Sequence, residues 1–144
     1  MIGLTAFILT ASVTRADPIS LDGGNLIAFP IVALFALAVE AAVVALLLTL
    51  RGMAPVPLFI AYFFTNVAVF ILLLISVVFV YRIPLAVFEL FAIIADGLCI
   101  KLLSGLEIFQ GDEFQNVSWL RSMVISCVGN AISYFAGAAA TRLF

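Results

Sequence analysis

The sequence predicts an all-α membrane protein whose four transmembrane helices form two antiparallel hairpins. Of the 144 residues, 67% are hydrophobic and only 10% are charged, whereas soluble domains carry about 25% charged residues. The apolar residues gather in four long runs, each long enough to cross a hydrocarbon core about 30 Å thick. A soluble domain of this size has too small an interior to cover so much apolar surface. We therefore expect an integral membrane protein in contact with the lipid bilayer.

Residues 1–16 are similar to a short secretory signal peptide. The apolar stretch in this segment is too short to span a membrane. Thr14 and Ala16 are small residues placed as at a signal-peptidase cleavage site, and the polar stretch DPISLDGGN follows. We therefore predict a signal peptide over residues 1–16 and a transmembrane domain over residues 17–144. Because no Lys or Arg precedes Arg15, the alternative is a retained segment that lies in the membrane interface.

Four helices are predicted from the long apolar runs, over residues 26–50, 56–80, 84–103 and 117–140. Asn25 is a suitable N-cap for the first helix, and Pro55 is tolerated at the start of the second. The connections at residues 51–55 and 81–84 are short, so the helices that they join are antiparallel neighbours. In the longer loop at 104–116, the spacing of Asp112 and Gln115 predicts a capping box for the fourth helix.

The two halves of the chain align with each other. The aligned pairs are FALAVEAAV (35–43) with FAIIADGLC (91–99), and FFTNVAVF (63–70) with CVGNAISYF (127–135). This alignment places Glu40 opposite Asp96 and Asn66 opposite Asn130. It predicts a tandem parallel repeat with a pseudo-two-fold axis along the membrane normal, as in some transporters. The alternative is chance, because Ala, Leu and Phe recur in any membrane protein.

Polar side chains interrupt each of the four apolar runs. Glu40 lies ten residues before the end of the first helix and Asn66 ten residues after the start of the second. In a tight hairpin the two share one depth, so we predict a hydrogen bond between them. Glu89 and Asp96 lie two turns apart on one face of the third helix, and Asn130 in the fourth is placed to bond with either.

Two interpretations of these intramembrane acids are favoured over a third, in which they pair with a cation of another subunit. A charge at the bilayer centre costs about 2.5–3.5 kcal/mol on insertion scales, so something must offset it. In the first interpretation the acids are structural, because polar side chains join membrane helices at about 0.6 kcal/mol per hydrogen bond. In the second, Glu40 and Asp96 line an ion or proton pathway or bind a cationic solute.

The fourth helix carries a stripe of small and polar residues. Its members recur at helical spacing: Ser122, Ser126, Asn130, Ser133 and Gly137. Small residues let another helix approach closely. The stripe packs either against the other three helices or against a second copy of the chain or another membrane subunit.

Several function classes are disfavoured. The chain has no His, which removes the commonest general base and metal ligand, and Asp96 is the only Asp within an apolar run. The six basic residues are spread singly, so no patch for nucleic acid exists. We expect no enzyme, no cofactor, no metal site and no nucleic-acid partner.

We expect a small multi-pass protein that acts as a helical scaffold or accessory subunit of a membrane complex, either as a homo-oligomer or joined to other subunits through the fourth helix. The alternative is an ion- or proton-coupled carrier or channel module that uses Glu40 and Asp96. The expected location is a prokaryotic cytoplasmic membrane with the mature N-terminus outside. This orientation places Arg51, Lys101 and Arg121 on the cytoplasmic side.

Overall fold

The structure is a computed structural model that describes residues 23–79 and 85–140. Its elements are α2 (Gly23–Thr49), α3 (Pro55–Phe79), α4 (Leu85–Ser104), the 3₁₀ turn η1 (Glu107–Phe109) and α5 (Trp119–Ala140). The predicted all-α class with four long helices is confirmed over these residues. Asn25 lies inside α2 and is therefore not the N-cap that the sequence predicted. The predicted signal peptide and the turn at 81–84 lie outside the described residues.

Three helices contain segments that are long and apolar enough to cross a membrane. These segments are Pro30–Thr49, Pro55–Leu72 and Trp119–Ala140. The fourth, α4, carries Glu89, Asp96 and Lys101 within its 20 residues. Large apolar side chains also lie exposed on the outside of the helices, among them Leu46 and Phe64. These features indicate a membrane location, since water would solvate such a surface poorly.

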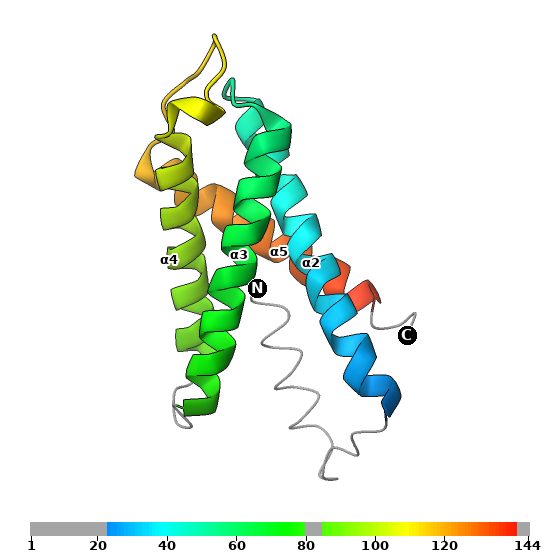
Figure 1. Ribbon diagram of the computed structural model, residues 1–144. Helices are drawn as coiled ribbons and strands as arrows, with labels where there is room; N and C mark the ends of the chain where they lie inside the picture. The colour runs from blue at the N-terminus through cyan, green and yellow to red at the C-terminus, as the bar shows by residue number, and fades with distance from the viewer. Residues whose placement is uncertain (1–22, 80–84, 141–144) are drawn as a thin grey trace.

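The four helices form a ring of neighbours. α2 packs on α3 and α5, and α4 packs on the same two helices. Figure 1 shows α4, α3 and α2 from left to right, with α5 crossing obliquely behind them. α2 and α4 therefore occupy diagonal positions, as do α3 and α5. Side chains that point inward from all four helices meet along the middle of the bundle.

The α2–α3 turn and the α4–α5 loop dock onto each other at one end of the bundle, at the top of Figure 1. The Gly111 backbone N–H donates to the Gly52 carbonyl at 2.7 Å, and the Ala54 N–H donates to the Phe109 carbonyl at 2.9 Å. Gly52 has a φ of 75°, a conformation that glycine adopts without steric cost. Both helix pairs are thereby tied together through their backbones.

The predicted capping box for the fourth helix is wrong. α5 begins at Trp119, and its first turn is capped by Ser118, whose Oγ accepts from the Arg121 backbone N–H at 3.4 Å. Gln115 has another partner, because its Oε1 accepts from Arg51 Nη1 at 2.8 Å. The physical reason is the docking of the loop, which keeps the backbone before residue 118 outside the helix.

Apolar contacts lie on both sides of Glu40 and Asp96 along the helices. The larger cluster lies toward the docked loop and consists of Ala41, Val44, Leu48, Met53, Leu58, Tyr62, Ile100, Phe109 and Val117. On the other side, Leu37 and Ala92 are buried together with side chains of α3. The polar residues of the bundle interior are therefore enclosed between two apolar layers.

Candidate functional site

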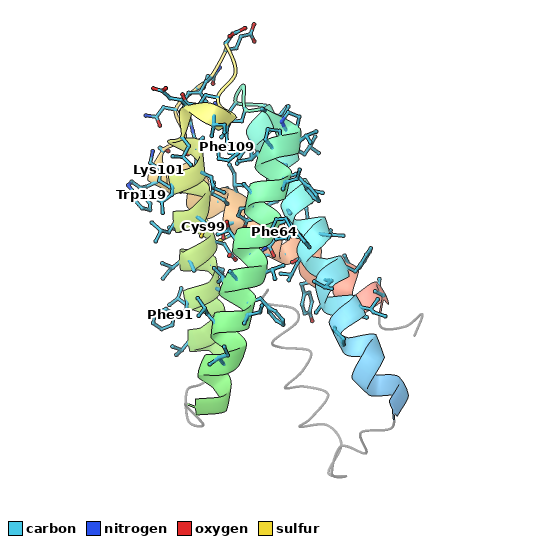
Figure 2. The ribbon with its side chains drawn as sticks, viewed as in Figure 1. Phe64, Phe91, Cys99, Lys101, Phe109 and Trp119 are labelled. Atoms are coloured by element: carbon cyan, nitrogen blue, oxygen red, sulfur yellow. The ribbon has the colours of Figure 1, made fainter. Side chains whose placement is uncertain are left out.

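A cluster of polar side chains fills the middle of the bundle, and every helix contributes to it. We call it the central polar cluster, and its members are Glu40, Tyr62, Asn66, Asp96, Ser126, Asn130 and Ser133. Each of these side chains is at most 2% exposed. Phe91 and Trp119, by contrast, project outward from the bundle in Figure 2 and are more than half exposed.

Asn130 lies at the centre of the cluster. Its Nδ2 donates to Asp96 Oδ2 at 3.1 Å and to Glu40 Oε1 at 3.3 Å. The same nitrogen lies 3.0 Å from the Ser126 backbone carbonyl. An amide nitrogen carries only two hydrogens, so these acceptors share them. One asparagine on α5 thus brings together two carboxyl groups from the diagonal helices α2 and α4.

Glu40 accepts hydrogen bonds from two neighbouring helices. The Tyr62 hydroxyl on α3 and the Asn130 amide on α5 both donate to its Oε1, the former at 3.1 Å. Ser133 Oγ lies 3.4 Å from Oε2, while its one hydrogen has a nearer acceptor in the Asn130 carbonyl at 2.9 Å. Gly129 lets α5 approach α2 closely, because a Cβ there would lie 3.3 Å from Glu40 Cγ. Oε1 of this carboxyl group therefore receives two neutral donors.

The predicted hydrogen bond between Glu40 and Asn66 is not formed. Asn66 is 1% exposed, yet neither its amide nitrogen nor its amide oxygen has a hydrogen-bond partner. Equal depth in a hairpin does not fix the rotation of each helix. The longer side chain of Tyr62, one turn before Asn66 on the same face of α3, reaches Glu40 in its place.

Asp96 is bonded through only one of its carboxyl oxygens. Its Oδ2 accepts from Asn130, whereas its buried Oδ1 has no hydrogen-bond partner. The contact with Asn130 is the one that the sequence allowed for either Asp96 or Glu89. The side chain of Glu89 lies outside the described part of the structure.

The stripe on α5 faces the interior of the bundle. Ser122, Ser126, Ser133 and Gly137 are all buried. The Ser126 hydroxyl donates to the Ile93 carbonyl of α4 at 3.0 Å, and a Cβ on Gly137 would lie 3.6 Å from Ala36 Cβ of α2. The stripe therefore packs against the chain's own helices. A second subunit that docked on these residues would require them to be exposed.

Tyr62 is the cluster member that the sequence interpretation missed. It lies four residues before Asn66, so both share one face of α3. That spacing is the signal that points to Tyr62, since a buried tyrosine hydroxyl needs a hydrogen-bond partner. The cation closest in sequence to Asp96 is engaged elsewhere, because Lys101 Nζ donates to the Val117 carbonyl at 2.7 Å.

The chemistry of the cluster is that of carboxyl groups held by neutral donors. Among the described residues, no group of three or more His, Cys, Asp or Glu side chains is placed to hold a metal ion. The cluster contains two acids, two amides and three hydroxyl groups. Such a set can bind, hold and release a proton, or contact a small cation.

Comparison with known proteins found no match to this chain among family models, curated proteins or solved structures.

Proposed function

We propose that this protein is a membrane carrier or channel module that exchanges a proton or a small cation at the carboxyl groups of Glu40 and Asp96. One observation carries the proposal. Asn130 Nδ2 donates to an oxygen of each acid, so the two groups lie within two hydrogen-bond lengths of each other in the buried middle of the bundle. The proposal includes two further statements. The two halves of the chain are a repeat in which Glu40 corresponds to Asp96, and α4 forms a fourth transmembrane span.

Electrostatics supports this function over a purely structural one. Two ionised carboxylates this close repel each other strongly where no water screens them. The pair is therefore favourable only with a proton or a cation that offsets one charge. Glutamine and asparagine would join the helices with the same hydrogen bonds and without the cost of a buried charge. Ionisable residues inside a membrane are accordingly the first place to expect a function.

The scaffold or accessory-subunit function is the second candidate. The observation that favours it is the closure of the central polar cluster, whose side chains are at most 2% exposed. A cluster of this kind is also suited to fixing the helix arrangement. The stripe on α5 gives no support to a subunit interface, since it is covered by α2 and α4. A partner would have to bind to the apolar outer faces of the helices.

The test is an ion-flux measurement on the full chain reconstituted in liposomes. An imposed pH gradient is followed with an internal pH-sensitive dye, and sodium and potassium gradients are compared in parallel. We expect flux above that of empty liposomes for one of these cations. Glu40→Gln keeps a hydrogen-bond acceptor and removes the titratable group. This variant should therefore reduce the flux at least about tenfold.

The matched control is Cys127→Ser, which changes an exposed thiol on the outer side of α5 and should leave the flux unchanged. Flux that is absent from the wild-type protein, or unaltered in Glu40→Gln, would rule out the proposed function. The scaffold function would then be favoured, because it requires neither titration nor transport.

A further inference from the structure

We infer that the exchanged ligand is a proton and that it resides on Oδ1 of Asp96, with the Asn66 amide as its hydrogen-bond partner. This inference rests on the proposed function and deepens it, because it names both the ligand and the group that binds it. The two acids of the cluster then have different roles, although the alignment of the two halves treats them as equivalent.

Hydrogen-bond geometry separates the two acids. Glu40 accepts at Oε1 from two donors, the Tyr62 hydroxyl and the Asn130 amide. Ser133 Oγ lies 3.4 Å from Oε2, but its one hydrogen has a nearer acceptor in the Asn130 carbonyl at 2.9 Å. Asp96 differs, because Asn130 donates to its Oδ2 while Oδ1 has no partner. Asp96 is therefore the acid held by fewer donors, and a proton on its Oδ1 displaces none of them.

The Asn66 amide has the chemistry to pair with Asp96 in both protonation states, and the bond between them, which this structure does not contain, would form during exchange. Both of its amide atoms are buried and unpartnered, and it lies on the same face of α3 as Tyr62, whose hydroxyl reaches the cluster. An amide oxygen accepts from a protonated carboxyl group, and an amide nitrogen donates to an ionised one. A buried amide with no partner is costly, so a role in the exchange explains why Asn66 lies here.

The groups that face Asp96 are consistent with this assignment. α2 presents Glu40, α3 presents Tyr62, and α5 presents the neutral Asn130. On its own helix the nearby ionisable group is Cys99. On release, the O–H bond of Asp96 breaks, the proton passes to water and the electron pair remains on Oδ1. On uptake, a proton from water restores that bond.

The test is infrared difference spectroscopy of the wild-type protein in lipid, titrated with acid and base. A protonated carboxyl group has a carbonyl stretch that disappears when the group ionises. Between about pH 9 and about pH 5, above the range in which ordinary carboxyl groups titrate, we expect one such band, shifted by ¹³C-aspartate labelling and unaffected by ¹³C-glutamate. The band should persist in Glu40→Gln and vanish in Asp96→Asn. Asn66→Leu should change its frequency, because the acid loses its amide partner.

A band that follows the glutamate label instead, or that vanishes in Glu40→Gln and persists in Asp96→Asn, would overturn the assignment to Asp96. A spectrum that responds to sodium at constant pH and not to pH would overturn the proton as the ligand. Labelling of the wild-type protein decides between the acids even if a variant fails to fold. If the aspartate band titrates but liposomes show no flux, the proposed function fails and the assignment to Asp96 stands.

Discussion

Asn130 is the residue on which the interior of the bundle depends. Its single amide group contacts both acids and the backbone of its own helix. A buried acceptor that loses such a donor costs several kcal/mol where no water replaces it. Gly129, the residue before Asn130, has the complementary role of letting α5 approach α2.

Two glycines of α5 allow a matched test of this close approach. A Cβ on Gly129 would lie 3.0 Å from Val44 Cγ2, whereas a Cβ on Gly137 would lie 3.6 Å from Ala36 Cβ, an ordinary contact. We expect Gly129→Ala to lower the free energy of unfolding by about 1–3 kcal/mol through overpacking. Gly137→Ala should be neutral or stabilising by up to about 1 kcal/mol, because alanine favours the helix.

The measurement is unfolding of the purified protein as a denaturing detergent is added to a mild one. Trp119, the only tryptophan of the chain, serves as the fluorescent reporter. Equal effects of the two substitutions would show that the spacing between α2 and α5 is not set at Gly129.

Every member of the site except Tyr62 could be predicted from the sequence, but the partners of Glu40 could not. Glu40, Asn66, Asp96 and Asn130 stand out because each is a polar residue within an apolar run, and all four are buried. The depth of a residue along a helical hairpin follows from the number of residues that separate it from the turn. Rotation about each helix axis depends on packing with all neighbours at once, and for this reason the predicted bond between Glu40 and Asn66 was wrong.

At the scale of elements, the helices follow from hydropathy and the loop does not. Each long apolar run forms a helix. The capping box failed because Asp112 and Gln115 belong to a loop whose backbone bonds to the distant α2–α3 turn. Local spacing rules do not register a contact between segments about sixty residues apart in the chain.

Gly52 tests whether this docked end holds the two helix pairs together. A Cβ there would lie 2.6 Å from the Glu113 carbonyl carbon, and the φ of 75° disfavours any side chain. Gly52→Ala should therefore lower the free energy of unfolding by at least about 1–2 kcal/mol. Detergent unfolding followed through Trp119 measures the loss.

The control for this variant is Glu113→Ala. It removes an exposed side chain and leaves intact the backbone that Gly52 approaches. A stability of Gly52→Ala equal to that of the control would mean that the turn and the loop separate without cost to the bundle.

At the scale of the whole molecule, the chain is an apolar ring of helices around a polar centre. The outer faces of the helices carry large exposed apolar side chains, while acids, amides and hydroxyl groups are enclosed. A water-soluble protein has the opposite distribution. The diagonal placement of α2 and α4 also explains how Glu40 and Asp96, from separate helix pairs, reach a common donor on α5.

The central claim is that this pair of acids exchanges a proton and is more than a structural contact. It is tested most directly by counting the protons that the protein in lipid nanodiscs takes up between about pH 9 and about pH 5, the range around neutrality in which ordinary carboxyl groups have barely begun to bind protons. The wild-type protein should take up about one proton more than the double variant Glu40→Gln, Asp96→Asn, since only the pair differs. Equal counts for the two proteins, with the same fold by circular dichroism, would contradict the account.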